Sequence, residues 1–393
     1  MKVTQIKDLL NATMKEVLGE EAVVQDDLSN VVDLGKEVVD TDNLDNYVKK
    51  LVNHIGKVIF TNRLYKGGVP SVLMDKWEFG SILEKISADM PDAEESDSWK
   101  LTDGQSYDQD IFYQPSVSAK FFNSSVTFEI PLSFTEKQVK ESFSDITQLN
   151  GFLSMLQTAV QNSLTVKVES LIMKTMNNAI GETLNDAKTN TDSVKAVNLL
   201  DLYNKQVEAA DAITTVDKAL INPAFMRYAS YIIAMYKDRI SKISTLFNVG
   251  KKQRFTPADN LHLVLLSDFA KASDVYLSSD VFHNENVELP AYETVPYWQG
   301  SGEGYALDDV SKVMVKTSSG ATVEQTGIVG VMFDTNAIGV SNLDQRVTTN
   351  YNAKAEFYTN FYKMDAGYYN DLNENFVVFY LAPATAPAPA TGK

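Results

Sequence analysis

The feature that most constrains the fold is a strand that leads into one very long helix. From Phe122 to Phe134 the sequence reads Phe-Asn-Ser-Ser-Val-Thr-Phe-Glu-Ile-Pro-Leu-Ser-Phe, so that apolar and polar residues alternate. This period of two predicts a strand with one buried face. Pro131 cannot donate a hydrogen bond to a neighbouring strand, so we expect the strand to lie at a sheet edge or to bend there.

After Asp145, a predicted N-cap, the spacing of the apolar residues becomes helical. They recur at steps of three and four as Ile146, Leu149, Leu153, Leu156, Val160, Leu164, Val168, Leu171 and Ile172. The pattern stops near Gly181, and a helix of that length spans roughly 54 Å. A polar linker over 185–193 is expected next. An extended segment that feeds so long a helix is typical of a protein that reaches its neighbours, not of a compact enzyme.

Composition limits the class of protein. The chain has 393 residues with 44% hydrophobic content, enough for two or three cores, and it contains no cysteine. Its net charge of −17 argues against a protein that grips nucleic acid through phosphates, because such binding needs clustered Lys and Arg. The N-terminus lacks an apolar signal core and no 18-residue apolar run occurs, so we expect neither export nor membrane spanning.

Charge is concentrated in two segments of opposite sign. Eight acids lie between Asp89 and Asp110 against Lys100 alone, with Glu94, Glu95 and Asp97 at the centre. A basic cluster follows later in the chain as Lys237, Arg239, Lys242, Lys251, Lys252 and Arg254. Each has an ordinary explanation, a solvated loop for the acids and a helix C-terminus for the cations. The alternative is that the acidic tip docks on the basic cluster of another subunit.

The first half of the chain has little that could fold alone. Residues 1–60 are polar and broken, which favours an arm that wraps on something else. Residues 71–88 and 112–134 together predict one long two-stranded excursion. Its large apolar groups are Trp77, Phe79, Phe121 and Phe122. An isolated ribbon cannot bury such groups, so they imply a partner surface.

Residues 194–340 favour a small α/β domain. We expect a helix over 196–210, a buried strand over 218–221, and a helix that begins at Asn222-Pro223 and runs to about Phe247. Further strands are predicted over 261–266 and 328–333. Alternation returns over 351–362, a last strand is expected over 376–381, and the Pro/Ala tail 383–393 is expected to be flexible.

No catalytic, cofactor or metal site is predicted. The three histidines, His54, His262 and His283, lie in different segments without ligand spacing; His283 with Glu285 comes nearest to a cluster. Gly300-Ser-Gly-Glu-Gly304 lacks the strand before it and the Lys-Ser/Thr after it that a phosphate loop needs. Nucleophile-elbow and zincin motifs are absent from the sequence.

The order of these parts resembles the Hong Kong 97-type shell fold, and the chain resembles the major capsid proteins of tailed double-stranded-DNA bacteriophages, small short-tailed phages in particular. The similar stretches cover about 75–180. They are Trp77-Glu-Phe-Gly-Ser-Ile-Leu-Glu-Lys-Ile, Asp92-Ala-Glu-Glu-Ser, Gln114-Pro-Ser-Val-Ser-Ala-Lys-Phe-Phe, Thr127-Phe-Glu-Ile-Pro-Leu-Ser-Phe-Thr-Glu-Lys-Gln and Phe152-Leu-Ser-Met-Leu.

The resemblance implies an α+β fold with a definite layout. Residues 1–65 would be the N-terminal arm, 66–135 an extended hairpin loop over a neighbouring subunit, 136–195 with 341–382 a peripheral domain with a spine helix, and 196–340 an axial domain. The protein would be a structural component of the virion, made in the host cytoplasm. It would form pentamers and hexamers in an icosahedral shell around double-stranded DNA, which it would not bind sequence-specifically.

The resemblance also implies partners. No long helical scaffolding domain precedes the arm, so a separate scaffolding protein, or a segment already removed, is expected, together with a portal and optionally a decoration protein. Three alternatives stay open. They are an encapsulin-type cellular nanocompartment shell, an enzyme of unknown type, and another virion protein such as a tail-tube component.

Overall fold

The computed structural model describes residues 73–74, 82–91, 93, 95–96, 98–107, 110, 112–135, 146–191, 194–278, 289–299 and 307–383. The chain divides into two compact units. One contains the described residues of Pro131–Asn162 and Thr349–Asn360, and the other contains those of Lys66–Ile130, Ser163–Thr348 and Phe361–Lys393. The predicted arm over 1–65, the N-cap Asp145 and nearly all of the tail lie outside the described residues.

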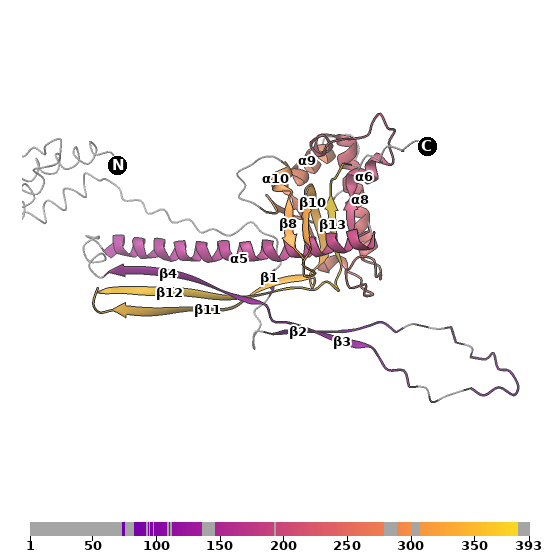
Figure 1. Ribbon diagram of the computed structural model, residues 1–393, viewed down its shortest axis with the longest axis horizontal. Helices are drawn as coiled ribbons and strands as arrows, with labels where there is room; N and C mark the ends of the chain where they lie inside the picture. The colour runs from indigo at the N-terminus through magenta and orange to yellow at the C-terminus, as the bar shows by residue number, and fades with distance from the viewer. Residues whose placement is uncertain are drawn as a thin grey trace, which may run out of the picture. The chain divides into compact units, whose positions relative to one another are not determined.

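The predicted long helix is confirmed as α5, Ile146–Asn190, whose 45 residues correspond to about 68 Å. Figure 1 shows it as one continuous helix. Its predicted end near Gly181 is wrong, and so is the predicted linker over 185–190. Leu184 and Ala187, which are 2% and 7% exposed, continue the buried stripe beyond Ile180 at steps of four and three. Burial therefore extends the helix through a residue of low helix propensity.

Gly181 is required by packing. A Cβ at this position would lie 2.0 Å from Cγ2 of Val315, in the neighbouring strand β8, Val313–Lys316. We expect Gly181→Ala to destabilise the fold by ~1–3 kcal/mol through overpacking, although alanine is the better helix former. Urea unfolding of a double-mutant cycle with Val315→Ala checks this: the second substitution should relieve much of the first one's cost. Strictly additive effects would show that the contact is not the cause.

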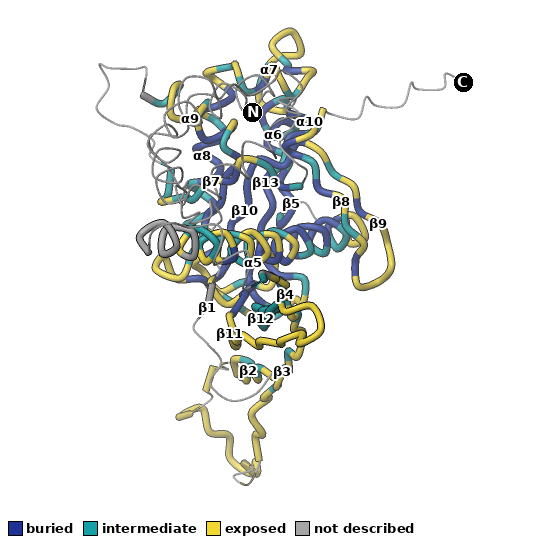
Figure 2. The backbone as a smooth tube through the Cα atoms, turned by 90° about the vertical axis from the view of Figure 1, so that its left-hand side faces the viewer, coloured by how far each residue is buried: buried dark blue, intermediate teal, exposed yellow. Residues whose placement is uncertain are grey.

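The main core lies in a five-stranded sheet of order β5-β13-β10-β6-β7. The strands are β5 (Ala196–Asn198), β13 (Phe376–Tyr380), β10 (Ile328–Asp334), β6 (Leu261–Leu266) and β7 (Glu293–Val295). The central strand β10 pairs antiparallel with both β13 and β6, and every one of its residues is buried. Figure 2 shows this burial as a dark blue sheet. The predictions of strands over 261–266, 328–333 and 376–381 are confirmed.

Short helices and one longer helix accompany this sheet. They are α6 (Leu199–Asn204), α7 (Val216–Leu220), α8 (Pro223–Ile240), the 3-10 turn η1 (Ala258–Asn260), α9 (Ser267–Ser278) and α10 (Leu307–Val310). The predicted start of α8 is confirmed: the Asn222 side chain accepts a hydrogen bond from the Phe225 backbone N–H at 3.1 Å, and Pro223 occupies the first turn.

Three predicted elements of this region are wrong. Residues 196–198 form strand β5, paired parallel with β13, so the helix expected over 196–210 is only α6. Residues 218–221 lie in and just after helix α7; Ala219 is buried there while Ile221 is 68% exposed. Helix α8 ends at Ile240 rather than Phe247, because the Ile240 carbonyl accepts from the Thr256 backbone N–H at 2.9 Å and the chain turns between them.

A second sheet has four strands in the order β1-β11-β12-β4. These are β1 (Leu73–Met74), β11 (Ile338–Asn352), β12 (Phe357–Asn370) and β4 (Ser125–Thr135). Strand β4 lies at the edge that Pro131 predicts, and its burial alternates as expected from Ser125 to Ser133. The alternation read over 351–362 belongs to two strands rather than one, because β11 and β12 are separated by a turn at 353–356.

Two further two-stranded ribbons complete the described elements. One pairs β2 (Leu83–Ala88) with β3 (Val117–Phe122), and the other pairs β8 with β9 (Thr322–Gln325). The predicted excursion over 71–134 is therefore too long, since β1 and β4 belong to the four-stranded sheet. We call the β2–β3 ribbon the root hairpin. It leads into the long loop drawn in yellow in Figure 2.

Candidate assembly surface

The root hairpin has its polar side turned inward and its apolar side turned outward. The β2 and β3 strands pair antiparallel in the register Leu83↔Phe122 to Ala88↔Val117, and burial alternates along both. The outward face carries Ile86, Val117 and Phe121, which are 65%, 60% and 65% exposed, and one charged residue, Glu84, opposite Phe121. The half-buried face carries Lys85, Ser87, Ser118 and Lys120 between Leu83 and Phe122. A free-standing subunit therefore exposes the side that water disfavours.

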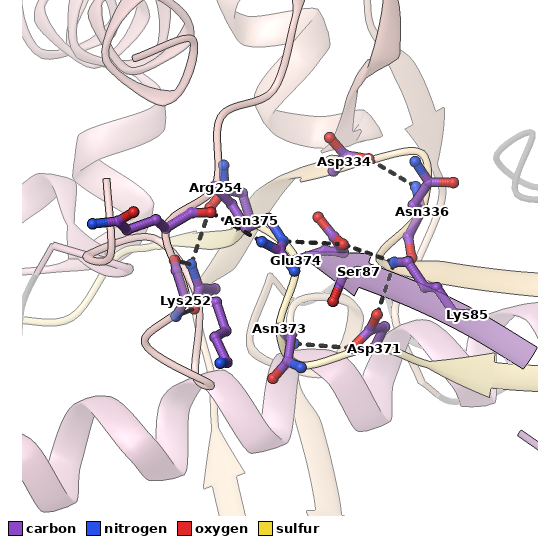
Figure 3. Close-up of polar contacts among 12 residues, drawn as sticks. Lys85, Ser87, Lys252, Arg254, Asp334, Asn336, Asp371, Asn373, Glu374 and Asn375 are labelled. Carbon is purple, nitrogen blue, oxygen red and sulfur yellow. Dashed lines mark hydrogen bonds and ion pairs between the residues drawn. The ribbon is translucent and has the colours of Figure 1, made fainter. Parts of the chain in front are cut away.

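Charged groups hold the inward face. The Lys85 ammonium contacts Asp371 Oδ2 at 2.7 Å and Glu374 Oε1 at 2.8 Å, and Lys120 contacts Asp371 Oδ1 at 2.9 Å. Arg254 Nε lies 3.5 Å from Glu374 Oε1. We call these five residues the anchor cluster. Figure 3 shows Lys85 and Arg254 on either side of the segment that carries Asp371 and Glu374. The Asp371 side chain is only 3% exposed, so its two lysine contacts are partly shielded from solvent.

The backbone around Asp371 fixes its position. Its N–H donates to the Ala337 carbonyl at 2.7 Å, and its Oδ1 accepts from the Asn373 N–H at 3.1 Å. One aromatic contact adds to the charges, with the rings of Phe122 and Tyr369 4.9 Å apart. Burial, reinforced by the charges of Asp371, Glu374 and Asp334, raises the pKa of Tyr369 to about 12. The side chain thus stays neutral at physiological pH.

The anchor cluster makes the root of the hairpin sensitive to acid. Burial on its own would raise the pKa of Asp371, but the hydrogen bonds from Lys85 and Lys120 outweigh it, and the pKa lies below its ordinary value. A carboxyl group whose pKa is lower in the folded state than in the unfolded state stabilises the fold at pH values above its unfolded-state pKa. That stabilisation is lost as the pH falls through the folded-state pKa.

We therefore expect the free energy of unfolding to decline as pH falls below about 4, in part through Asp371. Urea unfolding of the wild-type chain and of Asp371→Asn across pH 2–7 measures that part, because the variant lacks the titrating group. The difference between the two curves should be largest near neutral pH and shrink on acidification. A difference that does not change with pH would contradict this role.

The structure separates the contact residues predicted from the sequence into three groups. Phe121 and Glu95 are exposed, whereas Phe122 is half-buried against Tyr369. Lys252 and Arg254 contact acids of their own chain; Lys252 contacts the Asp89 carboxylate at 3.0 and 3.1 Å. Outside the described residues lie Trp77, Phe79, Glu94 and Asp97.

The other predicted basic contact residues, Lys237, Arg239 and Lys251, lie in two different elements. Lys237 and Arg239 lie in the last turn of α8, and the Arg239 guanidinium lies 5.8 Å from the ring centroid of Tyr236. Lys251 is exposed and has a positive φ of 51°. The residues of the predicted basic cluster thus have two kinds of surroundings. Lys252 and Arg254 contact acids of their own chain, and Arg239 and Lys251 are exposed to solvent.

Sequence reasoning did not find the anchor cluster. Asp371 and Glu374 lie 286 and 289 positions from Lys85, and no local pattern links such distant residues. One signal was available. Lys85 and Lys120 face each other across two alternating strands, while Ile86 and Phe121 lie on the other face, so the lysine face is the one that needs acidic partners.

The structure describes one of the three histidines of the sequence, His262. His262 stacks on Phe333 with ring centroids 5.6 Å apart, which is an ordinary packing role. No group of three or more His, Asp or Glu among the described residues could hold a metal ion. His54, His283 and the glycine-rich segment 300–304 lie outside the described residues. The helices described include none long and apolar enough to cross a membrane.

Comparisons with known proteins define the class. The model of the Phi29-like phage major capsid protein family matches residues 10–380. Among solved structures, a chain of the Staphylococcus phage Andhra capsid is similar with a TM-score of 0.51 and 8% identity, over 84% of this chain and 87% of that one. A chain of the cyanophage P-SCSP1u capsid gives a TM-score of 0.47 at 9% identity, over 85% and 95%. No curated protein sequence matches the chain.

The Andhra capsid chain shares the mixed α and β fold. The family-model match over residues 10–380 defines the class, a structural protein that builds the head shell of a phage. The chain belongs to the Phi29-like phage major capsid protein family. The protein is located in the virion capsid, where many copies of it form the shell.

Proposed function

We propose that the chain closes an icosahedral head shell through a Hong Kong 97-type fold, with copies grouped in pentamers and hexamers. The observation that carries this proposal is the inverted root hairpin. Its inward face is satisfied by ion pairs of its own chain, and its outward face exposes Ile86 and Phe121 at 65% each. A second copy lying on that face would remove the exposed apolar area from water, and many copies would repeat the gain.

The proposed layout assigns a role to each part of the chain. Residues 1–65 form the N-terminal arm, and 66–135 form the extended-loop region. Within that region β1 and β4 belong to the four-stranded sheet, and the root hairpin with the loop beyond it lies on a neighbouring subunit. Residues 136–195 with 341–382 form the peripheral domain, of which α5 is the spine helix. The axial domain is 196–340, and 383–393 is a flexible tail. The length of α5 supports its role as the spine helix. Strand β13, at the end of 341–382, pairs with β5 and β10, so in this layout it belongs to the sheet of the axial domain.

We further propose partners for assembly. A separate scaffolding protein guides closure, a portal occupies one vertex, and a decoration protein is an optional addition. The double-stranded genome is enclosed without sequence-specific binding, which accords with a net charge of −17 that disfavours adhesion to phosphates. We propose no enzymatic activity. The family match favours a phage head over the nanocompartment and tail-tube alternatives.

Negative-stain imaging of the purified chain, expressed alone and with its scaffolding protein, tests the proposal. Closed shells of uniform size with pentameric and hexameric clusters are the expected result. A chain that stays monomeric at high concentration, across salt conditions and with the scaffold present, would refute it.

A further inference from the structure

Residues 241–256, which connect α8 to η1, form a loop that we call the finger. Its turn is packed on the chain, since the Gly250 N–H donates to the Leu372 carbonyl at 2.9 Å and Asn248 is buried. The finger contains four cations, Lys242, Lys251, Lys252 and Arg254, and no acid. Its two sides are joined at Ser244 and Arg254, whose backbone N–H groups each donate to the other's carbonyl at 3.0 Å. The Asn248 side chain closes the turn by accepting from the Lys252 N–H at 2.8 Å and donating to the Lys252 carbonyl at 2.8 Å.

Like the root hairpin, the finger has charged side chains that contact its own chain and apolar side chains that are exposed to solvent. Two of its cations contact acids of the same chain beside the root hairpin. Lys252 contacts Asp89, which follows β2, and Arg254 contacts Glu374 of the anchor cluster. Ile243 and Phe255 flank the Ser244–Arg254 pair and are therefore cross-strand neighbours on the opposite face. They are 51% and 52% exposed, and nearby Leu246 is 52% exposed. Lys242 and Lys251 of the finger are also exposed. The exposed side chains of the finger, which we call its outward face, are therefore apolar and cationic.

The loop beyond the root hairpin carries the complementary chemistry. Trp99, Phe112 and Tyr113 are 96%, 84% and 81% exposed. Exposed acids accompany them at Glu95 and Asp103. The full stretch from Asp89 to Asp110 holds eight acids against Lys100 alone. Aromatic rings attract cations as well as apolar side chains, so this acidic aromatic tip matches the outward face of the finger in both respects.

We infer that the finger of one copy is the docking surface for the acidic aromatic tip of a second copy. The inference rests on the proposed function, in which the extended loop lies on a neighbouring subunit, and it names the surface that receives the loop. Within one copy the contact is not made, because the tip aromatics and the finger's Ile243 and Phe255 are all exposed. The Lys252–Asp89 contact shows that a cation of the finger pairs with an acid next to β2 of its own chain. In the inferred contact, the acids of a second copy's tip pair with the cations on the outward face of the finger.

Charge reversal in the full chain, with its scaffolding protein present, tests the inference. Lys242→Glu with Lys251→Glu should slow shell assembly, followed by light scattering, at least tenfold at low salt. Glu95→Lys with Asp103→Lys should do the same. Because every copy carries both surfaces, the chain with all four substitutions should regain most of the wild-type rate. The matched control is Lys218→Glu, an exposed lysine of α7 outside the finger, which should assemble at the wild-type rate.

A cross-link supplies a second readout that does not depend on rate. The chain contains no cysteine, so Asp103→Cys with Lys251→Cys introduces the only two thiols. Oxidation of assembled shells should join copies into covalent ladders on a non-reducing gel. The single variants should form none.

The outcomes separate this inference from the function on which it rests. If the finger variants assemble normally while root-hairpin variants such as Phe121→Ser do not, the finger is not the receiving surface and the proposed function still stands. Loss of assembly in both pairs without rescue in the fourfold variant also overturns the tip as occupant. If root-hairpin variants assemble normally as well, neither surface takes part in association. The proposed function itself fails only if the unaltered chain stays monomeric with its scaffolding protein present.

Discussion

Replacing Ile86 and Phe121 together by serine is expected to abolish shell assembly while the isolated subunit remains folded. Both side chains are 65% exposed in the single chain, so the subunit loses little burial when they are removed. Assembly would lose ~1.5–3 kcal/mol for each large apolar group that a neighbour covers, and the loss would recur at every equivalent contact in the shell. Sedimentation with scaffolding protein present measures assembly, and thermal unfolding measures the subunit.

The control for this experiment is Ile221→Ser, which changes a 68% exposed isoleucine near α8 and should leave assembly intact. The melting temperature of the double variant should lie close to that of the wild type. If instead the double variant unfolds the subunit and the fraction that stays folded assembles normally, the root hairpin is an ordinary core element. The inverted face would then have no part in association.

Of the five residues of the anchor cluster, Asp371 should be the one whose replacement by alanine lowers the free energy of unfolding of the subunit most. Asp371→Ala leaves Lys120 without the carboxylate 2.9 Å away and deprives Lys85 of one of its two acids. Breaking a buried pair commonly costs ~3–5 kcal/mol, and we expect about 2–3 because the Lys120 side chain is 41% exposed and rehydrates. Urea unfolding measures the change, and hydrogen exchange should show loss of protection in β2 and β3.

The matched control is Asp201→Ala, which breaks an i,i+4 pair with a Lys205 side chain that is 67% exposed. Such surface pairs contribute ~0.3–0.5 kcal/mol, so the two aspartates should differ several-fold. Equal effects, or an Asp371 variant whose β2 and β3 amides stay protected, would mean that the ion pairs do not hold the hairpin root.

Patterns that are local in sequence predict much of this fold. The alternation from Val126 to Leu132, the apolar stripe of α5 and the Asn222-Pro223 cap each depend on neighbours a few residues away. The structure confirms the alternation and the cap, and it confirms the stripe from Leu156 to Ile172. The predicted ends fail where a distant contact decides them. Helix α5 continues through Gly181 because Leu184 and Ala187 beyond it are buried, and α8 stops at Ile240 because the Thr256 N–H binds the Ile240 carbonyl.

The short apolar run Lys218-Ala-Leu-Ile221 shows a different difficulty. A run of this length does not distinguish a buried strand from a helical turn, and here only Ala219 of the helix α7 is buried. The candidate site was only partly predictable for a related reason. Composition indicated exposed aromatics and opposite charges, but the pairing of Lys85 and Lys120 with Asp371 joins strands that only the folded chain brings together.

Thiol labelling of the shell tests the central claim most directly, because the chain has no cysteine of its own. A single Ile86→Cys substitution places the only thiol on the outward face of the root hairpin, and Ile221→Cys serves as an exposed reference. The rate of maleimide labelling is compared between the free subunit and the assembled shell. We predict that Ile86→Cys labels quickly in the subunit and at least tenfold more slowly in the shell, while the reference changes little. Equal labelling of Ile86→Cys in both states would contradict the account.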